Sequence, residues 1–396
     1  MGMAPEFPVT ATGYESVLSA VIERSVGPQA VEIDRTGAFP REGVQALGEA
    51  GLLGLLSARN VGGGGESLEA AARVIETVGN RCASTATVML MHYAAVAVLE
   101  AHGPQDVRRL IARGDHLSSL AFSEVGSRSH FWAPIGTAKA GPEDGPEDTV
   151  QLDARKSWVT SAGHADSYVW SSQPLAGQEK AASAMTLWLV PSKAAGLRVA
   201  AKFDGVGLRG SASSPVSGVN VVVPADARLG EDGAGWDIAM ATALPTFLVL
   251  NAALSLGIME ALVAEAGAHL ARSRLQHLNQ TLTEQPLSRA AFARLRIRTD
   301  GVRAFLRDTL EALATGRDDA PLRVLEVKAI AAEAASEVAD GAMQLCGDAA
   351  FRKELGIERL FRDALAARVM APTTEALHDF VGRTCLGLPL FDAPGA

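Results

Sequence analysis

The sequence predicts an α+β protein that is mostly α-helical, with an N-terminal helical domain at residues 1–118, a central antiparallel β-domain at 119–232 and a C-terminal four-helix bundle at 233–396. Three patterns indicate this order. Apolar residues recur at helical spacing up to about residue 118, short alternating runs follow, and long apolar helical segments occupy the last part. A chain of 396 residues is long enough for two or three such domains.

Composition and charge argue against several classes of protein. The chain is 48% hydrophobic and carries a formal net charge of -9 with no basic block, which does not suit nucleic-acid binding. Its three cysteines, Cys82, Cys346 and Cys385, have neither a disulfide framework nor a zinc spacing, so we expect no metal site. The N-terminus lacks the features of a secretory signal, and we therefore expect a reduced, cytoplasmic location.

The first part of the chain is predicted to form helices, which are separated by a glycine-rich break at residues 60–65. Ser67 follows the break and is expected to cap the next helix, which carries Val74 and Ile75. Residues 83–102 form a long apolar segment that is interrupted by His92 and Glu100, which favours a buried helix over a membrane span. We expect His92 to be a packed helix residue and not a ligand.

Two short stretches of the central part are candidates for cofactor binding. The loop Ser123-Glu-Val-Gly-Ser-Arg-Ser129 offers hydroxyl groups and a glycine that lets a ligand approach the backbone. The second stretch, Trp158-Val-Thr160, comes at the end of a predicted strand. Further strands are predicted at 167–171, 184–190 and 219–224, where β-branched and aromatic residues are frequent.

The last part is predicted to contain helices at 239–259, 262–275, 288–314, 321–346 and 358–370. The first of these is apolar and long enough to span a bilayer. Pro245, Asn251 and the absence of a flanking basic cluster favour a buried bundle helix instead.

Together, Ser-Glu-x-Gly-x-x-Ser and Trp-Val-Thr-x-x-Gly resemble the flavin-binding signatures of the acyl-CoA dehydrogenase family. In that family the first signature is Thr-Glu-Pro-x-Ala-Gly-Ser-Asp and the second is Trp-Ile-Thr-Asn-Gly. Val125 stands at the place of the proline and His130 at the place of the aspartate. The resemblance runs from about residue 13 to residue 383, and it implies helical, β and helical domains, FAD as cofactor and oxidation of an acyl thioester.

The resemblance also implies roles for single residues. Ser123 would lie near the pyrimidine edge of the flavin and Ser129 beside the cofactor, while Trp158 would pack on the isoalloxazine and Thr160 would point towards its N5. The remaining cofactor contacts that the family pattern suggests are Arg272 or Arg274 and Gln344, all from a neighbouring subunit, and Thr373. Because contacts would come from two chains, a homodimer or homotetramer is expected.

The catalytic base is where this sequence departs from the family. The usual glutamate stands in Tyr-Glu-Gly-Thr-Ser, eight residues beyond the aspartate of an Arg-Asp-Ala motif. Here that motif is Arg362-Asp-Ala364, and Ala371 occupies the glutamate position. The alternative base position of some relatives matches Phe247 or Leu248, which are also apolar. A positioned base contributes about 10²- to 10⁴-fold, or roughly 3 to 5 kcal/mol of barrier.

Three hypotheses accommodate this change. A dehydrogenase could take its base from elsewhere, with His130 and Glu375 as candidates and Glu124 and His378 as further ones. The protein could instead be a reduced-flavin monooxygenase that reacts with oxygen, although such relatives usually carry a histidine near residue 371. It could also be a base-less partner subunit of a hetero-oligomeric dehydrogenase, although its flavin motifs are intact. The dehydrogenase, acting on a thioester of coenzyme A or of a carrier protein and passing electrons to an acceptor, is the first choice.

Overall fold

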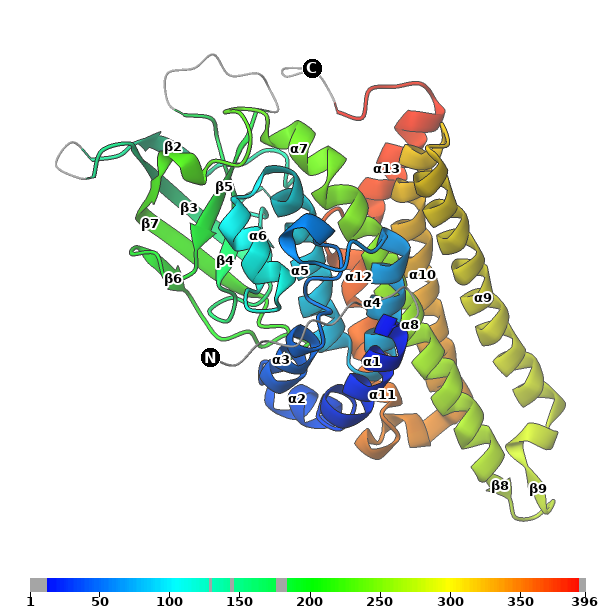
Figure 1. Cartoon of the computed structure of the whole chain (residues 1–396). Helices are drawn as coiled ribbons and strands as arrows, with labels where there is room; N and C mark the ends of the chain where they lie inside the picture. Colours follow the sequence, from blue (N-terminus) through cyan, green and yellow to red (C-terminus); the bar gives the residue numbers. More distant parts are fainter. Residues whose placement is uncertain (1–12, 128–129, 143–145, 176–183, 392–396) are drawn as a thin grey trace.

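The computed structural model describes residues 13–127, 130–142, 146–175 and 184–391. Helices come first, a region of strands follows and a second set of helices ends the chain, as the sequence predicts. In Figure 1 the strands β2 to β7 lie at one side of the molecule and the long helices α8, α9 and α10 at the other, with the N-terminal helices between them. The predicted fold class is therefore confirmed.

From residue 13 onwards the N-terminal helical part contains the α-helices α1 (Gly13–Val21), α2 (Ala30–Thr36), α3 (Arg41–Glu49), α4 (Leu68–Arg81), α5 (Ala83–His102) and α6 (Gln105–Ala112). Ser67 caps α4 as predicted, since its side chain accepts a hydrogen bond from the Ala70 N–H at 3.3 Å. His92 is buried in α5 and bonds to the Leu53 carbonyl at 3.1 Å and the Ser118 N–H at 3.1 Å. It is a packed residue that ties α5 to the first strand.

The described residues of the central part form two sheets. Their strands are β1 (Ser118–Ala121), β2 (Thr137–Ala140), β3 (Thr149–Val159), β4 (Ser167–Ser172), β5 (Thr186–Pro191), β6 (Leu197–Val199) and β7 (Ser214–Pro224). One sheet has the order β1-β4-β5 and the other β2-β3-β7-β6. Side chains such as Leu152, Trp188 and Val221 form one buried core of this part. The pairing of β1 with β4 is parallel, which departs from the all-antiparallel expectation.

The C-terminal part is built around α8 (Ala243–Arg272), which packs against α4, α5, α9 (Pro286–Thr315), α10 (Ala320–Cys346) and α11 (Ile357–Ala364). The remaining elements are α7 (Gly235–Ala241), the hairpin β8 (Arg274–Leu275) and β9 (Gln280–Thr281), α12 (Ala366–Val369) and α13 (Thr374–Cys385). The helices predicted at 239–259 and 262–275 are thus mostly one 30-residue helix. The helix predicted at 358–370 is divided into α11 and α12.

Two helical segments of the described residues are long and apolar enough to cross a membrane, Ala83–His102 and Gly235–Arg272. Of their most apolar windows, 83% and 89% respectively are buried inside the molecule. The apolar surface of α5 and α8 is therefore covered by other elements of the same chain, as in a core helix.

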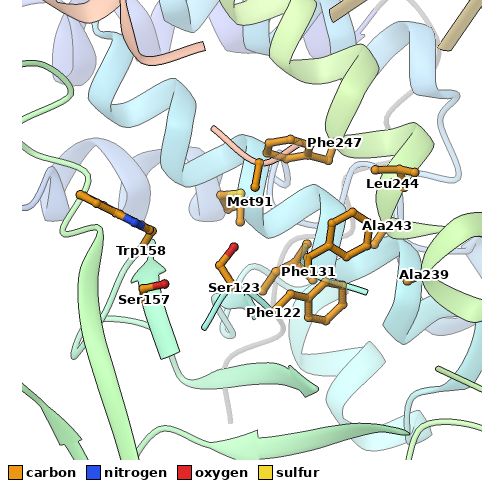
Figure 2. A pocket seen from close by; sticks show the side chains of 12 residues that line it. Met91, Phe122, Ser123, Phe131, Ser157, Trp158, Ala239, Ala243, Leu244 and Phe247 are labelled. Atoms are coloured by element: carbon orange, nitrogen blue, oxygen red, sulfur yellow. The ribbon is translucent and has the colours of Figure 1, made fainter. Parts of the chain in front are cut away.

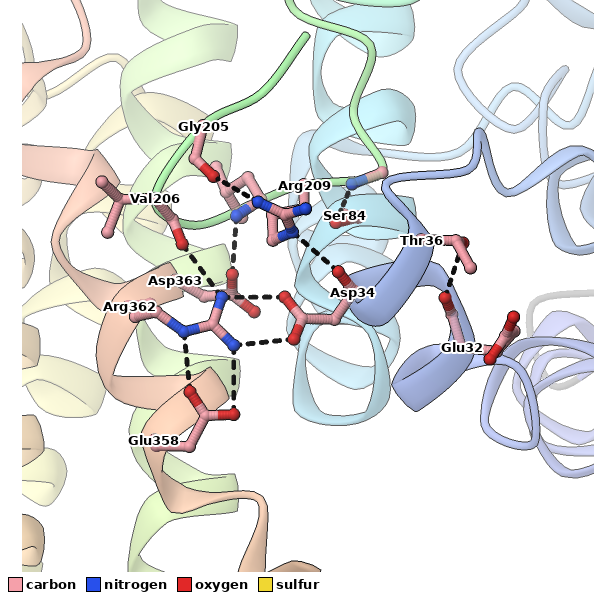
Figure 3. Close-up of polar contacts among 12 residues, drawn as sticks. Glu32, Asp34, Thr36, Ser84, Gly205, Val206, Arg209, Glu358, Arg362 and Asp363 are labelled. Atoms are coloured by element: carbon pink, nitrogen blue, oxygen red, sulfur yellow. Dashed lines mark hydrogen bonds and ion pairs between the residues drawn. The ribbon is translucent and has the colours of Figure 1, made fainter. Parts of the chain in front are cut away.

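The three parts of the chain meet at Arg362. Its guanidinium pairs with Asp34 of α2 at 2.6 Å and with Glu358 at 2.7 Å, and it donates to the Val206 carbonyl at 2.9 Å. Figure 3 shows these bonds. A Cβ at Gly207 would lie 2.4 Å from the Arg362 carbonyl oxygen, so only glycine allows this close approach. The junction fixes the β-domain against both sets of helices.

Candidate functional site

A pocket lies where the three parts of the chain come together. Its cavity volume is about 70 Å³. The lining residues come from α5, β1 and the loop after it, the end of β3, α7, α8 and the turn after α12: Met91, Leu120, Phe122, Ser123, Phe131, Ser157, Trp158, Ala239, Ala243, Leu244, Phe247 and Ala371. Trp158 and Ser157 lie on one side and the phenylalanines on the other, with Ser123 between them (Figure 2).

None of these described lining residues carries a titratable side chain. The hydroxyls of Ser123 and Ser157 and the indole N–H of Trp158 are the polar side-chain groups, and the rest of the wall is apolar. A pocket of this kind suits an apolar group, while a few hydroxyls can orient a polar ring or carbonyl beside it. The site is thus suited to positioning a ligand and offers no proton acceptor from its own described walls.

A buried ion pair supports the loop that carries Ser123. The Lys156 ammonium lies 2.6 Å from the Glu124 carboxylate, and the exposed fractions of the two side chains are 0% and 2%. Lys156 also donates to the Ser171 carbonyl at 2.7 Å and to its hydroxyl at 2.9 Å. Burial lowers the pKa of Lys156 to about 8, and the Glu124 carboxylate opposes this shift.

Glu124 is therefore a structural residue. Its second carboxylate oxygen accepts the backbone N–H groups of Ile135 and Gly136 at 2.5 and 2.8 Å. Both oxygens have partners inside the protein and Glu124 is not among the residues that line the pocket, so its role as a base stays an untested prediction.

Trp158 is held in an unusual conformation at the rim of the pocket. Its φ angle is +57°, in the left-handed region, and the pairing of β3 with β7 is irregular between Lys156 and Val159. The side chain is 69% exposed, which is rare for a tryptophan. An exposed aromatic ring beside two serine hydroxyls is a surface on which a planar ligand can stack.

Thr160 follows Trp158 by two residues and is not among the residues that line the pocket. It is 2% exposed, and its hydroxyl is 3.1 Å from the Ser213 hydroxyl, which is 2.8 Å from that of Ser211. Its predicted approach to a flavin therefore stays a prediction. Ser129, the other hydroxyl predicted to lie beside the cofactor, is outside the described residues.

The residues predicted to act on a neighbouring subunit's cofactor lie away from the pocket lining. Arg272 is exposed at the end of α8, and Arg274 donates to the carbonyl and side chain of Asn279 at 3.1 and 2.9 Å. Gln344 is exposed on α10 and donates to Asp340 at 2.7 Å. A single chain does not test these contacts, and they stay predictions.

The turn after α12 brings Ala371 into the pocket wall, and Phe247 of α8 lines the same pocket. Both positions at which the sequence led us to look for a carboxylate thus face the site, and neither has one. Thr373 caps α13 by accepting the Ala376 N–H at 3.3 Å. This bond occupies one of its lone pairs and leaves its role towards a cofactor a prediction.

The other candidate bases do not line the pocket. His130 is exposed, and its ring Nδ1 lies 3.1 Å from the Ser127 carbonyl. Glu375 is exposed in the first turn of α13, where backbone hydrogen bonding lowers the pKa of its carboxyl. His378 is 3.4 Å from Glu333. Their catalytic roles stay untested predictions.

An aromatic cluster closes the pocket beside Phe131. Phe131 and Trp132 contact Trp236 with ring centroids 6.1 and 6.4 Å apart, and Phe391 lies 4.7 Å from Trp132. Phe380 of α13 joins the cluster at 5.4 Å from Trp132. Met91, Ser157, Trp236 and the C-terminal aromatics give no local signal in the sequence, because they meet only in the folded chain.

Comparison with known proteins identifies the class of protein to which this chain belongs. Three family models match consecutive parts of the chain: acyl-CoA dehydrogenase N-terminal domain at residues 14–112, middle domain at 119–221 and C-terminal domain at 233–386. The molecule is an acyl-CoA dehydrogenase-like flavoenzyme, a flavin oxidoreductase by class. The chain belongs to the acyl-CoA dehydrogenase family.

Individual relatives agree with this assignment. The chain is 28% identical over 386 residues to the mitochondrial short-chain specific acyl-CoA dehydrogenase of Bos taurus, covering 93% of this chain and 88% of the relative. It is 26% identical over 376 residues to the probable acyl-CoA dehydrogenase YngJ of Bacillus subtilis, covering 92% and 94%.

Solved structures share the fold. Butyryl-CoA dehydrogenase from Megasphaera elsdenii superposes with a TM-score of 0.87 at 20% identity, covering 96% of this chain and 100% of the other. TdsC from Paenibacillus sp. A11-2, solved with FMN and indole, has a TM-score of 0.84 at 21% identity, covering 96% and 98%.

Proposed function

We propose that the protein is an FAD-dependent dehydrogenase of an acyl thioester, carried by coenzyme A or a carrier protein, with an atypical or displaced base. The observation that carries this proposal is the exposed Trp158 beside the hydroxyls of Ser123 and Ser157, at the mouth of an apolar pocket. FAD, when bound, accepts the hydride that leaves the β-carbon of the acyl group. Ser123 and Trp158 would hold its ring system, and a second copy of the chain would complete the cofactor site through Arg272 or Arg274 and Gln344.

The apolar wall suits the acyl part of the substrate. Phe131, Leu244 and Phe247 exclude water from it, which keeps the reacting carbon atoms in a medium of low polarity. A cavity of about 70 Å³ has space for roughly five to seven water-sized groups. A short acyl group fits this space, and the aromatic cluster beside Phe131 limits its extension.

Removal of the α-proton requires a group that the described lining lacks, and the family resemblance places Ala371 at the position of the usual glutamate. We propose that the proton leaves to a base outside these lining residues. His130 and Glu375 are the candidates from this chain, and either would have to approach the substrate when the ligands bind.

One observation favours a second candidate function. A pocket whose described walls carry no titratable group suits a reduced-flavin monooxygenase, which needs a cavity for oxygen chemistry more than it needs a base for an α-proton. TdsC, which shares this fold, was solved with FMN and an aromatic compound. A base-less partner subunit of a hetero-oligomeric dehydrogenase is the third possibility.

The test is anaerobic mixing of the FAD-loaded protein with a panel of acyl-CoA thioesters, followed by the absorbance of oxidised flavin. Bleaching by one thioester supports the dehydrogenase. Absence of bleaching, together with rapid oxygen-dependent reoxidation after chemical reduction, supports the monooxygenase. Absence of both would favour the partner subunit. A colourless protein that takes up no added FAD would refute the hypothesis that the protein is a flavoenzyme of any of these kinds.

The Ala371→Glu variant tests where the base belongs. If residue 371 keeps its place in the pocket, a carboxylate there raises the rate of bleaching by up to about 10²- to 10⁴-fold, the usual contribution of a positioned base. Ala371→Gln is the matched control, because it has nearly the same size and cannot accept the proton. Equal rates for the two variants would show that residue 371 does not reach the α-carbon.

A further inference from the structure

A buried lysine lies beneath the turn that carries Ala371. Lys328 of α10 is 0% exposed, and its ammonium contacts three backbone carbonyl oxygens. The distances are 2.9 Å to Ala367, 2.8 Å to Met370 and 2.7 Å to Pro372. No ion pair of Lys328 with a carboxylate is found among the described residues, although a buried lysine usually has one.

The contact pattern matches the chemistry of a helix end. The last carbonyls of a helix have no partner within it, and a cation placed there satisfies them and interacts favourably with the helix dipole. Here α12 ends at Val369, and the carbonyls of Ala367 and Met370 lie at that end. Lys328 supplies from α10 the donors that α12 cannot supply for itself.

The number of donors identifies the charge state that the turn requires. An ammonium has three N–H groups, one for each of the three carbonyls, whereas a neutral amine has two and would leave one carbonyl unpaired. Burial lowers the pKa of Lys328 to about 7, and the Glu375 carboxylate opposes this shift. With its protons engaged in this way, Lys328 is not a free proton acceptor for a substrate.

The bonds on either side of Ala371 determine where that residue points. The Met370 carbonyl precedes Ala371 and the Pro372 carbonyl follows it, and both are directed at Lys328 while Ala371 lines the pocket. From α8, the Asn251 amide contacts the Met370 sulfur at 3.4 Å. We infer that Lys328 is the positioning residue of this turn, and that it holds residue 371 as a fixed part of the pocket wall.

This inference deepens the proposed function, and it rests on that function only where activity is measured. The structural test is hydrogen exchange of the segment 366–377 in Lys328→Met, which keeps the length of the side chain and removes all three bonds. Lys328→Gln is the milder variant, because its amide can still donate two hydrogen bonds. Lys353→Met, an exposed lysine of the same C-terminal part, is the matched control.

The reporter amides are those of Met370 and Leu377, which bond to the Ala366 carbonyl at 3.1 Å and the Thr373 carbonyl at 2.9 Å. We expect exchange in this segment to be at least about 10-fold faster in Lys328→Met and intermediate in Lys328→Gln. Exchange in α5 and in Lys353→Met should match the parent. Unchanged exchange in a folded Lys328→Met protein would overturn the inference. Global unfolding of both variants would also count against it, because the lysine would then support the bundle as a whole.

Activity provides a second and separable readout. If Ala371→Glu gains dehydrogenase activity, adding Lys328→Met should remove most of the gain in kcat while FAD remains bound, because the carboxylate loses its fixed position. Retention of the full gain would contradict the inference. If Ala371→Glu gains nothing, the thioester hypothesis is weakened, while the exchange result still decides the role of Lys328.

Discussion

The buried pair of Lys156 and Glu124 allows a quantitative test of how the loop that carries Ser123 is supported. Lys156→Met keeps an apolar chain of similar length and leaves the Glu124 carboxylate buried with only backbone N–H partners. Removing one partner of a fully buried ion pair costs about 3–5 kcal/mol of folding free energy. The Ser171 carbonyl also loses a donor at 2.7 Å, which contributes to the same loss.

Charge neutralisation should reverse much of this effect. In the double variant Lys156→Met with Glu124→Gln no charge remains buried, and replacement of a buried pair by uncharged groups is often nearly neutral. We therefore expect the double variant to be more stable than Lys156→Met alone. Lys139→Met, at an exposed position of β2, is the control and should change stability by less than about 0.5 kcal/mol.

The assay is urea unfolding followed by tryptophan fluorescence, with refolding checked for reversibility, and FAD affinity measured on the same samples. A loss below about 1 kcal/mol in Lys156→Met would refute the reasoning, since it would mean that water or a local shift compensates the Glu124 charge. A double variant less stable than Lys156→Met would refute the assignment of the loss to an unpaired charge.

Two further predictions concern the rim of the pocket and the junction of the domains. Trp158→Asn should weaken FAD binding at least about 10-fold and leave the urea midpoint unchanged, because the ring is 69% exposed and asparagine tolerates the positive φ; a large fall in the midpoint would show that the ring supports the fold. Burial raises the pKa of Asp363 to about 6, so the fold favours its neutral form, and the stability that this form contributes is lost as the pH rises through about 6. Asp363→Asn can still accept the Leu208 N–H, which lies at 2.6 Å, and should be more stable than the parent by up to about 3 kcal/mol at pH 7.5. The measurement is the urea midpoint of the parent and of Asp363→Asn, at pH 7.5 and near pH 4. We expect the difference between their stabilities to vanish at the lower pH. An Asp363→Asn protein less stable than the parent at pH 7.5 would contradict the prediction.

Local patterns predicted much of the fold. The cap at Ser67, the packed His92 and the sequence of helical, β and helical parts follow from spacing and residue type. Helix boundaries were less predictable. The two residues between the helices predicted at 239–259 and 262–275 include no Gly or Pro, which is consistent with the single helix α8, but the apolar spacing did not show this continuity. The parallel pairing of β1 with β4 depends on contacts between distant strands, which no local pattern encodes.

Part of the candidate site was predictable from the sequence, and part was not. Family resemblance singled out Ser123 and Trp158 for the cofactor, and Ala371 and either Phe247 or Leu248 as base positions; of these, Ser123, Trp158, Phe247 and Ala371 line one pocket. The roles of Glu124 and Lys328 were missed. A charged residue in a sequence carries no sign of whether it will be buried, and both depend on partners far along the chain, Lys156 in one case and the turn at 367–372 in the other.

The pocket draws its walls from residue 91 through to residue 371, so its assembly depends on nearly the whole length of the chain. During synthesis the N-terminal helices emerge long before α8 and the turn at Ala371, and until then the apolar faces of α4 and α5 lack their main partner. Contacts of such large sequence separation form slowly, and incomplete chains expose apolar surface. A shortened gene product that ends before α8 would therefore lack the pocket wall formed by Leu244, Phe247 and Ala371, and it would be prone to aggregation.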